Sequence, residues 1–272
     1  RPEYDEESDL LFPNNPPTRF YITGDKHRHF DTVKQFCEVT GTTKDDVLIV
    51  LGDAGFNYYD DKRDDKLKTM VASLPITLFC LHGNKENRPQ NVGTYGMRNF
   101  YGGKVYYEPR YPNILFAIDG EVYRFNGKEY LVVGGAHSVD KHKCLAENKP
   151  YWDDEMPDAL VKQKVVSALE KREWKIHGIL THTCPMKYLP TEMFMSTRQD
   201  AEKKRKPQRK AKKIYKPDID RSTEEWLNDI ENKSTYEWWY CGHYHIDKSI
   251  DRIHMLHRQI LLLDMVKGAD MV

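Results

Sequence analysis

The sequence predicts a layered α/β domain, because apolar runs of strand length alternate along the chain with stretches of helical pattern. Three short runs, rich in aliphatic and β-branched residues, are each followed by polar residues that include a glycine, at 19–23, 47–51 and 76–81. Short apolar runs bounded by glycine are typical of buried strands rather than of helices. Strands and helices that alternate in sequence form sheets covered by helices, so we expect an α/β architecture.

Helices are predicted around 31–39, 60–73 and 158–174. The last has the clearest pattern, because its apolar side chains recur at roughly helical spacing. They are Leu160, Val161, Val165, Leu169 and Trp174.

The middle of the chain, about 104–135, has a different pattern. Proline, glycine and asparagine separate its apolar runs, which favours successive antiparallel strands. Two further strands are expected later in the chain, where apolar runs lead into histidine. The apolar runs lie at 114–117, 121–125, 130–133, 178–182 and 238–243.

Composition fits an ordinary globular protein. The chain has 272 residues, of which 39% are hydrophobic and 31% charged, so its core is large enough to fold without disulfides. Lysine plus arginine equals aspartate plus glutamate at 42 each, so no overall charge favours nucleic acid or a membrane surface. We expect an extended lead-in over 1–18 and a single domain over 19–272, with a basic insert at about 198–216.

The five cysteines are scattered and show no CxxC spacing, which indicates reduced thiols rather than a disulfide framework. No apolar run approaches the roughly 20 residues that a membrane helix needs. No signal-peptide pattern is visible at the start of the sequence. We therefore expect a cytoplasmic protein with no membrane partner.

Polar residues follow five of the predicted strands. They form the motifs Asp25-Lys-His27, Gly52-Asp53, Gly83-Asn84, His182 and Gly242-His243-Tyr-His245. Carboxylate, amide and imidazole groups are ligands for manganese, iron and zinc, and a carboxylate can bridge two ions. Because sites in α/β sheets form beyond the carboxyl ends of strands, we expect these side chains to meet. Each motif alone is weak, and a lone histidine is more often a surface or core residue. Five in order are a much stronger signal.

These motifs resemble the signature of the calcineurin-like metallophosphoesterases, which is D-x-H, GD-x-x-D, GNH[D/E], H and GH-x-H. The match runs from about residue 20 to 250, and within the superfamily the chain is similar to bacterial and phage-type phosphatases. The resemblance implies a four-layer α/β/β/α sandwich of two mixed β-sheets flanked by helices.

The resemblance also implies a site for two divalent or transition-metal ions, with manganese expected and iron or zinc as alternatives. One ion would take Asp25, His27, Asp53 and His245. The second would take Asp53, Asn84, His182 and His243, with Asp53 as the bridge. A hydroxide bridging the two ions would then attack the phosphorus of a phosphoester, either a monoester or a diester.

The sequence departs from the family signature at the position of a proton donor. The GNH[D/E] motif becomes Gly83-Asn84-Lys85-Glu86, and Phe56 stands where GD-x-x-D has its second aspartate. A lysine is protonated at neutral pH but gives up its proton poorly, and loss of a general acid typically costs about 10²–10⁴ in rate. Either another acid acts, or good leaving groups need little help, or activity is reduced.

We expect the catalytic residues to be Asp53, Lys85, Arg88 and His137. Arg88 follows Asn84 on the same loop and could hold a phosphate oxygen, whereas His137 follows an apolar run at 130–133. His29 and His82 are further candidates for the missing acid. The alternative for Arg88 and these histidines is a solvated loop position. Cys184 and Cys241, which adjoin the histidine motifs, fit small buried residues better than ligands.

The basic insert at 198–216 contains ten lysines and arginines and two acidic residues. Such a segment either binds nucleic acid or another anionic ligand, or is a solvated loop. Tyr215 is its one aromatic residue, so base stacking is not indicated.

Two other functions therefore stay open beside phosphoester hydrolysis. One is a catalytically weakened metal-binding scaffold, and the other is a nucleic-acid-binding protein on the same fold. All seven ligand positions are intact, which favours the enzyme.

Overall fold

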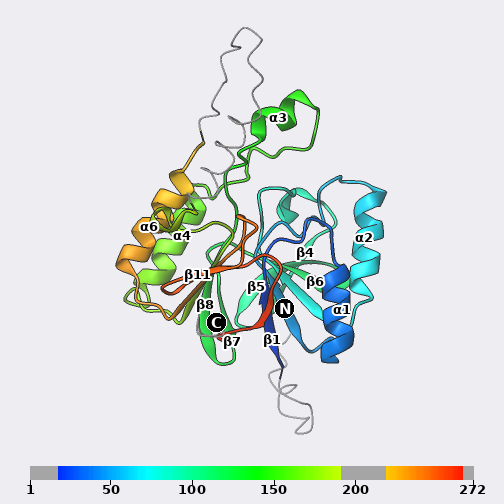
Figure 1. Cartoon of the computed structure of the whole chain (residues 1–272), viewed down its shortest axis with the longest axis horizontal. Helices are drawn as coiled ribbons and strands as arrows, with labels where there is room; N and C mark the ends of the chain where they lie inside the picture. The colour runs from blue at the N-terminus through cyan, green and yellow to red at the C-terminus, as the bar shows by residue number, and fades with distance from the viewer. Residues whose placement is uncertain (1–17, 191–218, 266–272) are drawn as a thin grey trace, which may run out of the picture.

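The computed structural model describes residues 18–190 and 219–265. Nearly all of the predicted lead-in and the whole basic insert at 198–216 lie outside these residues. Within the described part, the chain is a mixed α/β structure in which two mixed β-sheets are flanked by helices (Figure 1).

The first sheet has seven strands, of which four central neighbours are parallel and the outer strands antiparallel. In order across the sheet these are β13 (Ile260–Leu262), β1 (Phe20–Thr23), β2 (Val47–Val50), β3 (Thr77–Cys80), β6 (Tyr111–Ala117), β5 (Gly103–Glu108) and β4 (Gly96–Phe100).

The second sheet has six strands, again with four parallel neighbours between antiparallel edges. In order these are β11 (Lys248–Ile250), β12 (Ile253–Met255), β10 (Trp238–Cys241), β9 (Gly178–Thr181), β8 (Lys128–Val133) and β7 (Val122–Phe125).

Helices lie on both outer sides of the paired sheets, α1 and α2 on one side and α4 and α6 on the other, while α3 stands apart (Figure 1). Their bounds are α1 (Asp31–Thr40), α2 (Lys62–Ala72), α3 (Lys141–Ala146), α4 (Ala159–Glu170) and α6 (Ser222–Lys233), with short 3₁₀ turns η2 (Pro89–Asn91) and η3 (Met186–Tyr188).

Three apolar clusters account for this layering. One joins side chains of both sheets, including Ile49 and Phe79 from the first and Val132 and Leu180 from the second, so the sheets face each other. A second cluster packs α1 and α2 against the first sheet, and a third packs α4 and α6 against the second sheet. Burial of apolar surface on both faces of each sheet is the main force that holds these layers together.

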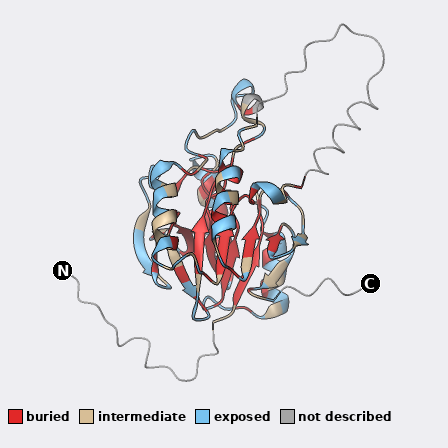
Figure 2. Cartoon of the chain, turned by 90° about the vertical axis from the view of Figure 1, so that its left-hand side faces the viewer, coloured by how far each residue is buried: buried red, intermediate tan, exposed pale blue. Residues whose placement is uncertain are grey.

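Because both faces of each sheet are covered, the central strands are buried along their whole length (Figure 2). This explains why their sequences are continuous apolar runs without alternation. The strands predicted at 19–23, 47–51, 76–81, 178–182 and 238–243 are all confirmed, each shorter by one or two residues.

The three predicted helices are also confirmed. Helix α4 begins where Asp158 accepts a hydrogen bond from the Val161 amide, which satisfies one of the unpaired amides of the first turn. It ends at Glu170 rather than near 174, because Glu173 and Trp174 have positive φ angles of 51° and 59° that a helix cannot contain.

The expectation of successive antiparallel strands over 104–135 is correct for neighbours within a sheet only. Strands β5 and β6 are antiparallel, as are β7 and β8. However, β6 and β7 belong to different sheets, and each sheet also pairs this region with a parallel strand, β3 or β9. The turn at 118–121 therefore carries the chain from one sheet to the other.

Across the described ranges 18–190 and 219–265, no helix is both long and apolar enough to cross a membrane.

Candidate metal centre

All seven predicted ligands lie just beyond the carboxyl ends of parallel strands. Asp25 and His27 follow β1, Asp53 follows β2 and Asn84 follows β3, all in the first sheet. From the second sheet, His182 follows β9 directly, and His243 and His245 follow β10. Both sheets therefore contribute side chains to one cluster, although Asp25 and His245 lie far apart in the sequence.

The first group consists of Asp25, His27 and His245, whose ligand atoms all lie within 4.8 Å of one another. His27 Nε2 is 3.6 Å from Asp25 Oδ2, and His245 Nε2 is 3.2 Å from the same oxygen. The two Nε2 atoms are only 2.8 Å apart. These donor types suit a divalent transition-metal ion.

The second group surrounds the fully buried His182. Its Nε2 lies 2.8 Å from Asn84 Oδ1 and 3.7 Å from Asp53 Oδ2, and its ring centroid is 5.0 Å from that of His243. Asp25, Asp53 and His182 also have ligand atoms within 4.8 Å of one another. The structure thus brings together all four residues that the sequence assigned to a second ion.

Asp53 lies between the two groups. Its Oδ2 is 3.8 Å from Nε2 of His27 in the first group and 3.7 Å from Nε2 of His182 in the second. This intermediate position fits a carboxylate that bridges two ions. Asp25 is also shared, because it belongs to both sets of closely spaced ligand atoms.

Neighbouring hydrogen bonds leave a lone pair of each key ligand facing the cluster. Nδ1 of His182 is 2.7 Å from the Leu51 carbonyl oxygen, which can only accept, so the proton lies on Nδ1 and Nε2 is left with its lone pair. Asn84 donates from Nδ2 to the Ser138 hydroxyl, which turns Oδ1 toward His182.

The two carboxylates are oriented in the same way. Asp53 Oδ1 accepts a hydrogen bond from the Lys85 amide at 2.7 Å, and Asp25 Oδ1 accepts one from the His243 amide at 2.8 Å. In each case Oδ2 is left for the cluster, and Oδ2 of Asp25 is buried with no hydrogen-bond partner.

The cluster therefore consists of acceptor atoms that face one another. A buried lone pair without a donor costs free energy, and two acceptors held 2.8 Å apart, such as His182 Nε2 and Asn84 Oδ1, repel each other. A cation satisfies all of these atoms together. On this test the side chains fit a metal ion, and the donor set of imidazole, carboxylate and amide oxygen fits manganese, iron or zinc.

Backbone strain also occurs at four of the candidate ligands. His27, Asp53, His243 and His245 have positive φ angles of 42°, 49°, 68° and 54°. Residues other than glycine rarely adopt this conformation, and such strain accumulates where function fixes a side chain. Strain at four of the seven candidate ligands supports a functional role for the cluster.

Glycine is required beside two of the ligands. A Cβ atom on Gly83 would lie 1.9 Å from Asp53 Oδ1, and one on Gly242 would lie 2.4 Å from Asp25 Oδ1. The glycines of the sequence motifs thus allow the backbone to approach the carboxylates.

Burial and neighbouring charges set the protonation of the cluster. Burial lowers the pKa of His243 to about 3, so its imidazole is neutral and able to bind a metal. Burial alone would raise the pKa of Asp25, but its contacts with His245 and His27 outweigh this and hold the pKa well below the ordinary value.

The cluster is open on one side. His182, Asp25 and Asp53 are buried, whereas the side chains of His27 and His245 are 34% and 47% exposed. A substrate could therefore approach the cluster from the side of His27.

Lys85 lies at this open side. Its backbone amide contacts Asp53, and its ammonium forms an ion pair with Asp140, just before α3, and lies 3.9 Å from the Cys144 thiol. Lys85 and His27 both line a cavity of about 570 Å³. The exposed His29 lines the same cavity.

Phe56 belongs to the core and not to the cluster. It is fully buried and stacks on Phe30 with ring centroids 5.1 Å apart. An acidic residue that lies near the cluster is Glu86, which is buried and accepts a hydrogen bond from the Gly55 amide. Burial raises the pKa of Glu86 to about 8, with a further contribution from the charge of Asp53.

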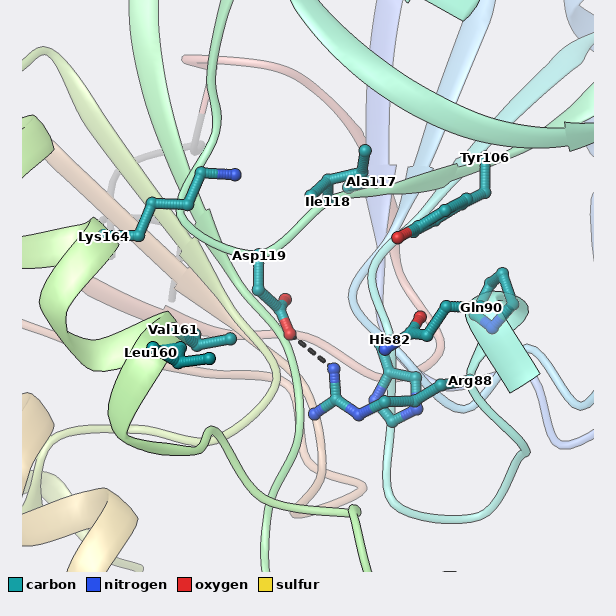
Figure 3. Close-up of a pocket in the computed structure, with 11 residues that line it drawn as sticks. His82, Arg88, Gln90, Tyr106, Ala117, Ile118, Asp119, Leu160, Val161 and Lys164 are labelled. Carbon is teal, nitrogen blue, oxygen red and sulfur yellow. Dashed lines mark hydrogen bonds and ion pairs between the residues drawn. The ribbon is translucent and has the colours of Figure 1, made fainter. Parts of the chain in front are cut away.

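Arg88 forms its ion pair outside the predicted ligand set. Its guanidinium lies 2.7 Å from Asp119 (Figure 3), and its Nε donates to the Asp154 carbonyl oxygen. With His82 it lines a separate cavity of about 220 Å³. Burial lowers the pKa of His82 well below its ordinary value, and neither of its ring nitrogens has a partner among the described residues. The predicted catalytic role of Arg88 has no support from these contacts.

His137 pairs with a different carboxylate. Its Nδ1 is 3.4 Å from Glu155 Oε1, and no contact with a metal candidate is seen among the described residues. The neighbouring Ser138 holds Asn84 instead. The sequence therefore indicated a loop that adjoins the cluster, but singled out a residue beside the one that touches it.

Cys184 and Cys241 are buried thiols without a disulfide. Burial raises the pKa of both, which keeps them protonated and makes them poor ligands. This agrees with the structural role expected for them.

Sequence reasoning missed Ser138 and the Leu51 carbonyl, which orient ligands, and Asp140, which pairs with Lys85. A backbone carbonyl has no signal in a sequence. Ser138 and Asp140 lie in the segment after the strand at 130–133, so a search for hydroxyl and carboxyl groups on that loop could have found them.

Comparison with known proteins gives distant similarities to solved structures. No protein-family model and no curated protein matches the chain. A crystal structure of TT1561 from Thermus thermophilus is 11% identical, with a TM-score of 0.45 and 89% of each chain covered. The protein of unknown function AQ665 from Aquifex aeolicus is 10% identical, with a TM-score of 0.33, 90% of this chain covered and 95% of that one. A third structure is 14% identical with a TM-score of 0.47, covering 89% of this chain and 90% of its own.

Proposed function

We propose that this protein is a two-metal phosphoester hydrolase of the calcineurin-like metallophosphoesterase type, with the four-layer α/β/β/α sandwich of that superfamily. The observation that carries the proposal is the set of facing acceptor atoms from Asp25, Asp53, Asn84 and His182, which bound cations would satisfy together. The backbone strain and the open side at His27 support it.

In this proposal one ion is held by Asp25, His27, Asp53 and His245, and the other by Asp53, Asn84, His182 and His243. Two bound divalent cations polarise water and the phosphoryl oxygens, so that a phosphoester is hydrolysed near neutral pH. Manganese is proposed, with iron or zinc as alternatives.

Lys85 supplies charge rather than an easily transferred proton. Its ammonium forms an ion pair with Asp140 beside the cavity that His27 also lines. A fixed positive charge stabilises the negative charge that develops on a leaving oxygen. The enzyme should therefore prefer phosphoesters with good leaving groups.

A panel of chromogenic phosphomonoesters and diesters with added manganese tests this proposal and separates phosphatase from phosphodiesterase activity. Replacement of a residue that merely orients a metal ligand costs about 10–100-fold, so Asp53→Asn should lower the rate at least about 100-fold. The exposed Asp45 provides a matched control, and Asp45→Asn should leave the rate unchanged.

A catalytically weakened metal-binding scaffold is the second candidate. It is favoured by one observation, the Lys85–Asp140 ion pair at the position where the superfamily signature has a histidine. Protein that holds two ions but hydrolyses neither ester type would support it. The basic insert, with its proposed nucleic-acid or anionic ligand, lies outside the described residues.

A further inference from the structure

The cavity of about 570 Å³ beside the metal centre is not explained by the hydrolysis of a small phosphoester. Its lining includes His27, His29, Tyr58, Tyr59, Lys85 and Lys149. Because His27 is also a candidate metal ligand, the cavity is continuous with the place where a phosphoryl group would lie. Whatever is attached to that phosphoryl group is therefore held in this cavity.

The size of the cavity indicates a large organic group. Pockets of roughly 300–1,000 Å³ hold organic ligands of drug size, whereas a phosphate with a short alcohol fills only a part of such a space. A cavity of about 570 Å³ suits a sugar and a ring system together.

One wall of the cavity is aromatic. The rings of Tyr58 and Tyr59 meet edge to face, with centroids 4.8 Å apart and an angle of 84°. Trp152 packs on Tyr58 with centroids 5.8 Å apart. Tyr58 is half-buried and held by these two rings, so it presents a fixed aromatic surface at little cost in conformational entropy.

Tyr59 is held by cations instead. The guanidinium carbon of Arg63 lies 3.5 Å from its ring centroid, and that of Arg28 lies 4.8 Å away. Arg28 is itself bonded to the Gly55 carbonyl oxygen and to Asp64. Tyr59 is thus part of a rigid support, and Tyr58 is the tyrosine with a ring available to a ligand.

The cavity also presents cationic groups. Its charged lining comprises Arg28, Lys85 and Lys149 with the carboxylate of Asp140. Arg28 pairs with Asp64 and Lys85 with Asp140, whereas Lys149 pairs with the exposed Glu147, a weak surface interaction that a bound phosphate could replace. An aromatic wall beside cationic groups is the combination that binds bases joined to phosphate.

We propose that the substrate is a nucleotide, whose phosphoryl group lies at the metal centre and whose nucleoside occupies this cavity with its base against Tyr58. This inference rests on the proposed function for the phosphoryl half of the substrate. The nucleoside half rests on the cavity alone, so the two halves are tested separately.

Binding of adenosine to the metal-free protein, followed by ligand-observed NMR, tests the cavity without any turnover. Stacking of a base on an aromatic side chain contributes about 1–3 kcal/mol, so Tyr58→Leu should weaken binding about 5- to 150-fold. Tyr58→Phe keeps the ring and should bind adenosine nearly as the wild type does. Tyr107→Leu, a half-buried tyrosine on β5 beside Arg98, is the matched control and should have no effect.

Kinetics with manganese then test the whole substrate. The ratio of the KM for adenosine monophosphate to the KM for glycerol phosphate should rise in Tyr58→Leu and not in Tyr58→Phe. Failure of the wild type to bind adenosine, or equal binding by the Tyr58→Leu variant, overturns the nucleoside site. If the wild type hydrolyses phenyl phosphate as efficiently as the nucleotide, the site recognises any aryl group and the nucleotide proposal is wrong. Adenosine binding without hydrolysis of either ester overturns the proposed function and leaves the nucleoside site standing.

Discussion

His182 illustrates how single hydrogen bonds prepare the candidate metal centre. The imidazole is fully buried, and donation from Nδ1 to the Leu51 carbonyl selects the tautomer with a free lone pair on Nε2. That lone pair faces Asn84 Oδ1, which is itself turned inward by Ser138. The chemistry of the ligands thus depends on residues that touch no substrate.

Ser138 gives a direct test of this dependence. Ser138→Ala removes the hydroxyl that accepts a hydrogen bond from Asn84, so the amide is free to rotate away from His182. Loss of such an outer contact typically costs about 10–100-fold in metal affinity, and we expect a loss of this size for one of two ions. Titration of metal-free protein with manganese measures it. Ser73→Ala, whose exposed hydroxyl donates to the Met70 carbonyl, should bind both ions as the wild type does. Unchanged affinity in Ser138→Ala would show that Asn84 is not held by this bond.

Replacement of Lys85 tests catalysis independently of metal binding. Lys85→His introduces a side chain that can give up a proton, so hydrolysis of esters with poor leaving groups should accelerate, by up to about 10²-fold. Bound metal should stay at the wild-type level, because the contact of residue 85 with Asp53 is made by its backbone amide. Parallel measurement of rate and metal content checks this. Loss of metal in the variant would mean instead that the Lys85–Asp140 ion pair holds the loop in place.

At the scale of elements, the loops that follow the strands position the candidate site, and contacts at the starts of the strands contribute to stability. Asp46 precedes β2 and accepts hydrogen bonds from the Arg19 guanidinium and the Thr43 amide, while its own carbonyl accepts one from Thr77 at the start of β3. The residue therefore ties the beginnings of three neighbouring strands together, at the end of the sheet opposite the metal candidates.

The Asp46 carboxylate should make stability depend on pH. Burial alone would raise its pKa, but the bonds from Arg19 and Thr43 outweigh burial and lower it. A carboxyl group with a lowered pKa in the folded state stabilises the protein above its unfolded pKa, and this contribution is lost as the pH falls through the folded pKa. The free energy of unfolding of Asp46→Asn should therefore be lower than that of the wild type near neutral pH and approach it in acid. Urea unfolding at several pH values measures this, and a constant difference between the two proteins would contradict it.

The elements that could be predicted are those whose pattern is local. Strands buried on both faces are continuous apolar runs, and ligands at their ends follow glycine, so both were visible in the sequence. Strand β4 was missed because its central residues are exposed and show no apolar pattern, and β11 to β13 because three-residue strands show no period. The division of β6 and β7 between two sheets depends on distant partners, which the sequence of the segment does not encode.

Helix α6 was not predicted, although its pattern is local. Its buried Leu227 and Ile230 are three residues apart, as on one face of a helix, so a window over 222–233 contained the information. The residues that orient the site were hidden for another reason. The partner of His182 is a backbone oxygen 131 positions away, and a backbone group is the same in every residue.

For the whole molecule, the two facing sheets are the feature that makes the site. Each sheet ends in part of the ligand set, Asp25, Asp53 and Asn84 from the first and His182 and His243 from the second. The apolar cluster between the sheets fixes their relative position, so the distances in the centre are set by the core of the protein. In the proposed centre each ion takes ligands from both sheets, so we expect that both sheets must pack before either ion is fully bound.

Native mass spectrometry of the manganese-loaded protein tests the central claim, a two-ion centre, most directly. We predict a mass increase equal to two manganese ions per chain for the wild type and to one ion for His182→Ala, because His182 belongs to only one of the two proposed ligand sets. A wild-type chain that retains no ion, or a His182→Ala chain that retains two, would contradict the two-metal centre.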